Sequence, residues 1–370
     1  MRDRLLAMRD RLLTNAAAQR MFAAFPLTRP IANSQARKAF DICAGFVYSQ
    51  VALACVRLGV FDAVRSSPMA VDELARRIDL PLNRTRTLID AAVAIDLLSH
   101  RSRDRVGLGQ IGAAIAGNPS ISAMIEHHAL LYDDLSDPVS VLRGSNTPTN
   151  IRQFWSYASG GARAADSDHE TAAYSKLMEQ SQSLISADII AAQSFSSYRR
   201  ILDIGGGHGA FLAALARAFP HLEGRLFDLP AVAAQANRHF AEAGLAERCI
   251  GIGGDFLADP LPTDFDAATL VRILHDHDDD VALKLLHAAR RAIRPGGTLI
   301  VAEPMRDTPG AARISDAYFG FYLMAMGSGR TRTPEEISRM LVASGFIEIR
   351  ILRTRQPLLV RVITAQMAHA

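Results

Sequence analysis

Residues 201–209 read Ile-Leu-Asp-Ile-Gly-Gly-Gly-His-Gly, an apolar run that ends in glycines at positions 205, 207 and 209. A strand that ends in such a turn lets the backbone approach a ligand closely, because glycine adopts left-handed dihedrals without steric cost. The Ala- and Leu-rich segment 211–219 indicates a helix after the turn. With Ala210 the pattern also fits the dinucleotide fingerprint, and Asp228 lies about 20 residues further on. The turn therefore predicts a nucleoside-binding cradle and leaves the cofactor open.

Strands and helices alternate along the chain after this turn. Strands are expected at 200–204, 225–228, 249–253, 267–273 and 298–303, which predicts a parallel sheet with helices on both faces. The last expected strands, 346–352 and 357–365, are joined only by Arg353-Thr-Arg-Gln. A parallel crossover needs about a dozen residues, so this pair must be antiparallel. Such a finish is typical of the methyltransferase variant of the doubly wound fold and argues against a dehydrogenase.

The chain before residue 198 has mostly helical periodicity, strongest in 40–64 and in 174–195. Short helices at 72–77 and 84–98 and a hairpin at 99–108 form a winged-helix pattern within about 40–110. Such an element either reads DNA, here through Arg84 and Arg86, or acts as a dimerisation scaffold. Because no basic surplus accompanies it, we favour dimerisation. The expected domains are an α-helical dimerisation domain, 1–197, and a ligand-binding α/β domain, 198–370.

Composition narrows the classes of protein that fit. The 370 residues include 41 basic and 38 acidic side chains, a net charge of +3 that indicates no nucleic-acid partner. Cys43, Cys55 and Cys249 share no ligand-like spacing and are expected to be buried thiols in a reducing compartment. Charges interrupt the apolar stretches before the roughly 20 residues of a membrane span, and no signal peptide is evident. We expect a cytoplasmic protein.

The N-terminus repeats itself, with Met-Arg-Asp-Arg-Leu-Leu beginning at both Met1 and Met8. The repeat places leucine pairs on one face of a helix. That helix is expected to be exposed or packed on a partner, with peripheral contact to a membrane as the alternative. Met8 is a second possible start of translation.

Two carboxylates follow the next expected strands. Asp228 suits two ribose hydroxyls at the carboxyl edge of the sheet, although it could instead cap the helix that begins after Leu229. Asp255 is placed to accept from an adenine amine while Phe256 covers the ring, unless Gly-Gly-Asp-Phe is a simple turn. The positions predict one shared nucleoside site.

The densest run of ionisable residues is His-Asp-His-Asp-Asp-Asp at 275–280. A metal site is one interpretation, but His275 and His277 stand two residues apart and do not share a helical face. The acids of 278–280 serve instead as the cap and first turn of the next helix. We therefore predict no metal here.

His275 is the first residue after its strand and is expected to point into the cleft between the domains. Glu303, at the end of the next strand, would stand beside it. A histidine held by a carboxylate is the usual arrangement for a general base. The alternative for both residues is helix capping and a solvated strand end.

The motifs together resemble the S-adenosylmethionine-dependent O-methyltransferases of plant and bacterial secondary metabolism. They are Leu-Asp-Ile-Gly-Gly-Gly-His-Gly, Phe-Asp-Leu-Pro at 227–230, Gly-Gly-Asp-Phe at 253–256 and Leu-His-Asp at 274–276. The resemblance covers the whole chain and implies a class I Rossmann-like methyltransferase domain behind a winged-helix dimerisation domain, in a homodimer. It implies S-adenosylmethionine without a metal, with His275 as base, Glu303 orienting it and Asp276 in the same catalytic group. The implied cofactor-binding residues are Asp203, Gly205, Gly207, Asp228, Leu229, Asp255, Phe256 and Arg272.

Longer stretches are similar to the carotenoid O-methyltransferases of phototrophic bacteria. They begin at Phe25, Ala44 and Ser315, the last reading Ser-Asp-Ala-Tyr-Phe-Gly-Phe-Tyr-Leu-Met-Ala-Met-Gly-Ser-Gly. The resemblance implies methylation of a hydroxyl on a hydroxyneurosporene- or demethylspheroidene-type carotenoid. The expected lining of an apolar substrate tunnel is Tyr318, Phe319, Tyr322 and Met326, a set that equally suits a core helix.

The sequence departs from the family pattern at two positions. His277 stands where tryptophan is usual, and Thr331 stands where the family has a second catalytic glutamate. The second departure puts a two-carboxylate mechanism in doubt. The open alternatives are an O-methyltransferase acting on a phenolic, polyketide or tetrapyrrole substrate and a winged-helix DNA-binding regulator.

Overall fold

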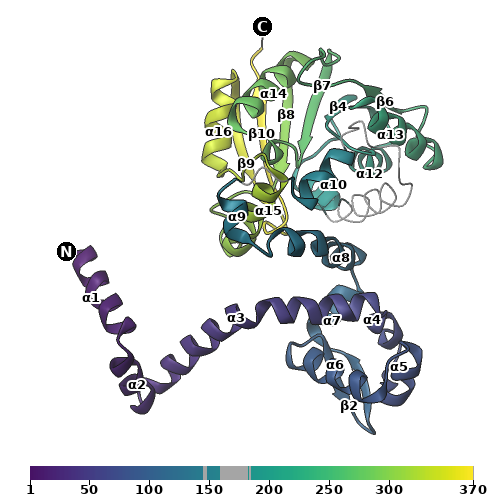
Figure 1. The fold of residues 1–370 in the computed structure, drawn as a ribbon. Helices are drawn as coiled ribbons and strands as arrows, with labels where there is room; N and C mark the ends of the chain where they lie inside the picture. Colours follow the sequence, from purple (N-terminus) through teal and green to yellow (C-terminus); the bar gives the residue numbers. More distant parts are fainter. Residues whose placement is uncertain (145–147, 159–181, 183–184, 370) are drawn as a thin grey trace. The chain divides into compact units, whose positions relative to one another are not determined.

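A computed structural model of the chain describes residues 1–144, 148–158, 182 and 185–369 (Figure 1). The chain divides into two compact units, Met1–Asn118 and Pro119–Ala370. The sequence predicts the boundary at 197/198 instead. Helices α8 (Pro119–Asp134) and α10 (Asn150–Ala158) pack on α15 (Phe319–Met326), so they belong to the second unit. Within the expected helical run 174–195, residues 174–181 and 183–184 lie outside the described residues, and residues 185–192 are helical.

A seven-stranded sheet organises the second unit, with strand order β6-β5-β4-β7-β8-β10-β9. The predicted antiparallel finish is confirmed, because β10 pairs antiparallel with both β8 and β9 while the other pairs are parallel. Chain order reverses at β4 and β7, where open α/β sheets bind ligands. The strands are β4 (Arg200–Ile204), β5 (Glu223–Asp228), β6 (Cys249–Gly253), β7 (Phe265–Val271), β8 (Ile293–Glu303), β9 (Phe346–Leu352) and β10 (Arg361–Met367).

Alternate residues of the central strands enter two separate cores. Leu202 packs with helices α14 (Asp279–Ala292) and α16 (Pro334–Ala343), and Ile201 packs with α12 (Ala210–Ala218) and α13 (Pro230–Glu242). Both faces of the sheet are thus covered by helices, as Figure 1 shows. This explains why the central strand β7 is buried along its whole length, whereas the edge strand β9 contains several exposed residues.

The first unit contains the elements that the winged-helix interpretation predicts. Helices α5 (Val71–Arg77) and α6 (Leu82–Ala94) precede a hairpin of β2 (Leu98–Arg101) and β3 (Arg105–Leu108). Strand β1 (Met69–Ala70) pairs with β3 and completes a small sheet. Helices α4 (Val60–Val64) and α7 (Gln110–Ala116) pack beside these elements.

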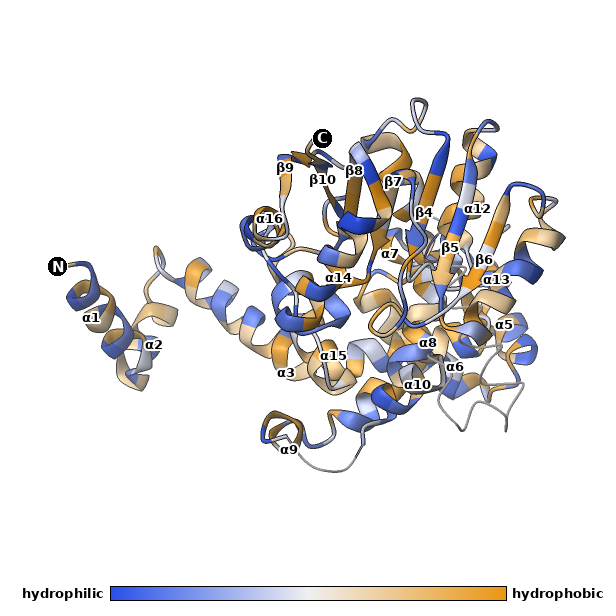
Figure 2. Cartoon of the chain, turned by 90° about the horizontal axis from the view of Figure 1, so that it is seen from above, coloured by the Kyte–Doolittle hydropathy of each residue, from blue (hydrophilic) through white to orange (hydrophobic). Residues whose placement is uncertain are grey.

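Three helices form an N-terminal arm with little buried surface: α1 (Arg2–Thr14), α2 (Ala16–Ala24) and α3 (Arg29–Arg57). Apolar and hydrophilic segments alternate along α1 and α3 in Figure 2. Contrary to expectation, one window of α3 is long and apolar enough to cross a membrane by composition, with a mean hydropathy of 1.6. Cys43, on α3, is exposed, so its expected burial is wrong, whereas Cys55 and Cys249 are buried.

Candidate active site

A cavity of about 480 Å³ lies at the carboxyl ends of β4, β5 and β7. Its wall contains every residue expected to bind the cofactor, together with His275 and Asp276. Those expected residues are Asp203, Gly205, Gly207, Asp228, Leu229, Asp255, Phe256 and Arg272. They come together because the carboxyl ends of neighbouring parallel strands meet at one edge of the sheet.

The glycine turn begins immediately after β4. Gly205, Gly207 and Gly209 have φ values of 68°, 59° and 85°, in the region that side chains disfavour. A Cβ on Gly205 would also lie 2.6 Å from Cδ1 of Ile273. Both the dihedrals and the close approach therefore require glycine at this position.

Asp228 joins the turn to the end of β5. Its Oδ2 accepts a hydrogen bond from the backbone N–H of Gly207 at 2.8 Å, and its Oδ1 accepts from that of Leu229 at 2.8 Å. The cap of α13 is Leu229, so Asp228 is not the helix cap that its position also allowed. Burial raises the pKa of Asp228 to about 6, although both amide hydrogen bonds act to lower it.

Asp203 is completely buried at the floor of the cavity. Its Oδ1 accepts from the hydroxyl of Thr269 at 2.6 Å, and Oδ2 has no hydrogen-bond partner among the described residues. Burial, together with the charge of Asp228, raises the pKa of Asp203 to about 7. A carboxyl group in this state suits a cationic or hydrogen-bonding ligand group in the cavity.

Asp255 and Phe256 line the cavity within a tight turn after β6. Asp255 Oδ1 accepts from the backbone N–H of Leu257 at 2.8 Å, and the Phe256 ring meets His277 edge-on at 5.5 Å. The simple turn that the sequence allowed is present. It leaves both side chains on the cavity wall, so contact with a nucleobase stays a prediction.

His275 is 3% exposed and lies between two carboxylates. Its Nε2 is 3.2 Å from Asp276 Oδ1, its Nδ1 is 3.5 Å from Glu303 Oε2, and its backbone N–H donates to Glu303 Oε2 at 3.1 Å. Burial lowers the pKa of His275, but Asp276 and Glu303 outweigh that effect and the net shift is upward. Glu303 lies beside His275 as expected, although Nδ1 of His275 makes no hydrogen bond among the described residues, and both side chains are buried instead of forming a solvated strand end.

The acids that follow His275 lie where the sequence predicts, with Asp279 and Asp280 in the first turn of α14, but the expected side-chain cap is not made. Asp278 holds the cap position of α14, but its carboxylate accepts from the backbone N–H of Gly329 at 3.0 Å instead of capping the helix. Asp279 forms ion pairs with Arg330 and Arg332. Within the described ranges of the chain, no group of three or more His, Cys, Asp or Glu side chains is arranged to hold a metal.

One further wall of the cavity comes from α15. Phe319, Tyr322 and Met326 line it as expected, and the Phe319 ring stands 6.0 Å from the His275 ring. Tyr318 is not among the described residues on this wall, because its hydroxyl lies 2.9 Å from Nε2 of His128.

The hydroxyl of Tyr322 has two partners that sequence reasoning missed. Trp155 Nε1 donates to it at 2.8 Å, and His127 Nε2 lies 2.6 Å away. Burial, and the nearby His128, lower the pKa of His127 to about 4, so a neutral His127 can accept a hydrogen bond from the Tyr322 hydroxyl. His127 and Trp155 come from α8 and α10, far from any of the motifs.

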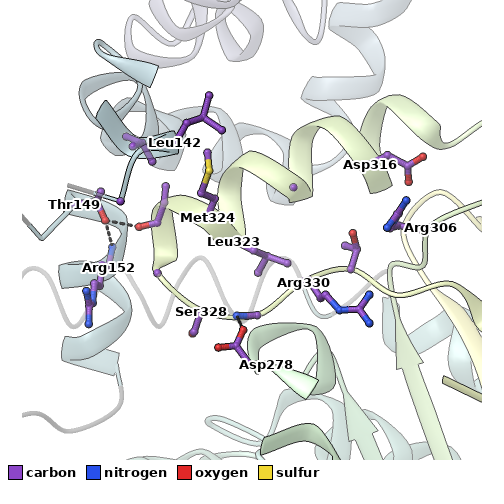
Figure 3. Close-up of a pocket in the computed structure, with 17 residues that line it drawn as sticks. Leu142, Thr149, Arg152, Asp278, Arg306, Asp316, Leu323, Met324, Ser328 and Arg330 are labelled. Carbon is purple, nitrogen blue, oxygen red and sulfur yellow. Dashed lines mark hydrogen bonds between the residues drawn. The ribbon is translucent and has the colours of Figure 1, made fainter. Parts of the chain in front are cut away.

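A second cavity, of about 810 Å³, adjoins the first. Figure 3 shows its charged rim, with Arg306 and Asp316 facing one another and Arg330 and Asp278 nearby. Arg152, Leu323 and Ser328 line both cavities.

The mostly parallel sheet with an inserted antiparallel β10, and the glycine turn above a buried histidine, define a methyltransferase of the class I doubly wound fold. The family model of the O-methyltransferase domain matches residues 132–347, and that of the O-methyltransferase dimerisation domain matches residues 40–111. The chain belongs to the O-methyltransferase family.

Several relatives share most of the chain. Demethylspheroidene O-methyltransferase of Cereibacter sphaeroides is 42% identical over 92% of this chain and 89% of its own length. The protein of the same name from Rhodobacter capsulatus is 38% identical over 96% and 88%. The solved structure of mitomycin 7-O-methyltransferase MmcR superposes with a TM-score of 0.75 at 24% identity, covering 92% of this chain and all of that one.

Proposed function

We propose that the protein transfers a methyl group from S-adenosylmethionine to the hydroxyl group of a hydroxylated carotenoid, with His275 as general base. The observation that supports this proposal most directly is the position of His275. It lies buried between Asp276 and Glu303 on the wall of the cavity that the glycine turn also lines. The relatives named demethylspheroidene O-methyltransferase support a carotenoid acceptor of the hydroxyneurosporene or demethylspheroidene type.

The cavity fits S-adenosylmethionine, which supplies an activated methyl group when bound. The unpartnered Oδ2 of Asp203 suits the cationic methionine end, near the Gly205 turn. Asp228, on the cavity wall, would bind the ribose hydroxyls, and Asp255 with Phe256, on the same wall, would hold the adenine. Arg272 lines the same cavity and brings a positive charge close to His275.

The residues of this chain have to align one oxygen and accept one proton. An aliphatic alcohol is too weak an acid for an imidazole to ionise beforehand, even one whose pKa neighbouring carboxylates raise, as they do at His275. His275 would therefore take the hydroxyl proton as the carbon–oxygen bond forms and the sulfur–methyl bond of the donor breaks, and Glu303 and Asp276 would stabilise the imidazolium that results. Positioning of the acceptor supplies much of the remaining rate enhancement.

The α15 wall favours an acceptor with a single polar group. Phe319, Leu323 and Met326 present apolar surface, and the Tyr322 hydroxyl is already engaged by Trp155 and His127. A polyketide or tetrapyrrole acceptor carries several polar groups that this wall would leave without partners. The end of an apolar polyene meets no such penalty.

The deciding experiment incubates the purified protein with methyl-labelled S-adenosylmethionine and a panel of acceptors. The panel contains hydroxylated carotenoids, phenols, polyketides and tetrapyrroles. We expect label on the carotenoid hydroxyl, and label on a phenol alone would replace the proposed acceptor. His275→Gln should lower kcat by about 10²-fold or more while leaving cofactor affinity largely intact. A variant that kept most of its turnover would reduce the mechanism to proximity.

We also infer that the protein contacts a membrane peripherally through α1 while remaining cytoplasmic. Leu5 and Leu12 are exposed on this helix beside several arginines, a composition that suits an anionic lipid surface. Removal of residues 1–13 should weaken co-sedimentation with anionic vesicles. Unchanged binding would remove the support for this contact.

A further inference from the structure

The segment 328–332 contacts the backbone on both sides of His275. Ser328 Oγ donates to the carbonyl oxygen of Asp276 at 3.0 Å, and the N–H of Gly329 donates to Asp278, a bond drawn in Figure 3. A Cβ on Gly329 would lie 2.2 Å from the carbonyl oxygen of His275. This segment therefore lies directly against the short 3₁₀ turn, Leu274–Asp276, that carries His275.

Arg332 makes the strongest of these contacts. Its side chain is completely buried, and its two terminal nitrogens donate to the carbonyl oxygens of Leu274 at 2.6 Å and His277 at 2.7 Å. Its Nε donates to Asp279 Oδ1 at 2.9 Å. One planar guanidinium thus joins the residue before His275, the residue two positions after it and the start of α14.

We propose that Arg332 is a positioning residue, which fixes His275 between Asp276 and Glu303 by bridging the carbonyl groups of Leu274 and His277. The proposal rests on the function assigned to His275 above. A bond angle or dihedral change in this turn would move the imidazole away from both carboxylates, and displacements of about 1 Å at a reacting group cost up to about 10²-fold in rate. A buried guanidinium suits the task because its rigid fork of donors cannot rotate freely as an ammonium does.

The chain provides a matched control in Arg330. This residue pairs with the same carboxylate, Asp279, and with Glu336, and within the described part of the chain its guanidinium donates to no carbonyl group around His275. Arg332→Lys and Arg330→Lys both keep the charge and both weaken the pairing with Asp279. Only Arg332→Lys removes the bridge across the His275 turn.

The readout is the titration of the His275 ring, followed by NMR in histidine-labelled protein and assigned with His275→Gln. The charged and titratable groups that face this ring are Asp276, Glu303, Arg272 and His277. We expect Arg332→Lys to move the titration midpoint down toward the ordinary histidine value and to lower kcat about tenfold or more, with cofactor affinity retained. Arg330→Lys should change neither quantity.

Asp279→Asn keeps the test decisive if Arg332→Lys does not fold. Asp279 is 53% exposed and is not among the groups that shift the pKa of His275, yet it anchors Nε of Arg332. Asp279→Asn should therefore lower the titration midpoint of His275 by less than Arg332→Lys does and by more than Arg330→Lys does. An unchanged His275 titration in the folded variants, or equal effects of the two lysine variants, would overturn the proposal. Retained turnover in His275→Gln would instead overturn the assignment of His275 as the base. The positioning proposal would still be tested, because the titration of the His275 ring does not depend on that assignment.

Discussion

Asp203 shows how a single buried carboxyl group links the cavity to the stability of the fold. Burial raises the pKa of Asp203 to about 7, whereas an aspartate in the unfolded chain has a pKa of about 3.9. Between these values the native state holds a proton that the unfolded state has lost. The contribution of protonated Asp203 to the free energy of unfolding is therefore fully present below about pH 4. It is lost as the pH rises through the native pKa.

Asp203→Asn should therefore stabilise the cofactor-free protein at pH 8 and leave its stability near pH 4 almost unchanged. The gain at pH 8 is at most about 4 kcal/mol, from about 1.4 kcal/mol for each unit of pKa difference. Thermal unfolding at both pH values measures it. Equal midpoints at pH 8 would mean that the buried Asp203 carries no proton near neutrality. The same variant should bind S-adenosylmethionine more weakly.

His275 should impose an acid limb on the pH–rate profile at a pH above its ordinary pKa of about 6.5, because only the neutral ring accepts a proton. Asp276 raises the pKa of His275, so Asp276→Asn should move this limb to lower pH. Asp280→Asn, an exposed neighbour in the same acidic run, serves as the control. Profiles of kcat/KM for the three proteins decide whether the limb belongs to His275.

The turn after α15 contains two glycines with similar dihedrals and different surroundings. Gly327 has φ 89° and Gly329 has φ 84°, so an alanine at either position pays a left-handed penalty of about 1–2 kcal/mol. A Cβ on Gly327 would meet only the flexible side chain of Arg152 at 3.1 Å. At Gly329 it would meet the backbone of His275 and Asp276.

Gly329→Ala should consequently lower kcat at least about tenfold, because the His275 turn has to move. Gly327→Ala should lose stability but retain most turnover. Steady-state kinetics alongside thermal unfolding separates the two effects. A similar loss of kcat in both variants would show that the dihedral strain, and not the contact with His275, is responsible.

Most of the sheet could be predicted because each buried strand is an apolar run that ends in a polar or glycine turn. The start of β8 could not, since Arg294-Pro-Gly-Gly is typical of a helix end, whereas the strand already begins at Ile293. Asp278 was expected to cap α14, and its interaction with Gly329 depends on a turn about 50 residues away in the chain.

The residues proposed to bind the cofactor could be predicted from the strand ends, but the surroundings of Tyr318 and Tyr322 could not. Tyr318 ends a π-helix, Arg313–Tyr318, which shifts the phase of the residues that precede α15. Tyr318 was expected on the tunnel wall, but its hydroxyl lies against His128, which no local pattern predicts. His127 and Trp155 reach Tyr322 from distant helices, and no local pattern marks them.

At the scale of the whole molecule, the match of residues 40–111 to a dimerisation domain supports a homodimer. Helix α3 carries large apolar side chains in the open, with Ile42 84% exposed and Phe46 66% exposed. Four residues apart, they lie on one face of the helix. An exposed apolar face of this kind is typical of a surface that a partner covers.

The double variant Ile42→Arg and Phe46→Arg should shift the protein from dimer to monomer in sedimentation velocity, because charged side chains would be buried without partners. Ile347→Arg on β9, an exposed isoleucine in the other unit, makes the matched control and should leave the dimer intact. A dimer that survives the double variant would place the interface elsewhere.

Strand β10 has a consequence for biosynthesis. It is the last strand in chain order, yet it lies between β8 and β9 in the sheet. A nascent chain on the ribosome has therefore made β8, with Glu303 at its end, long before the strand that covers its open edge emerges. An uncovered edge invites pairing with other chains. Prematurely terminated products should aggregate instead of forming a partly active enzyme, and catalytic competence should appear only after translation has passed β10.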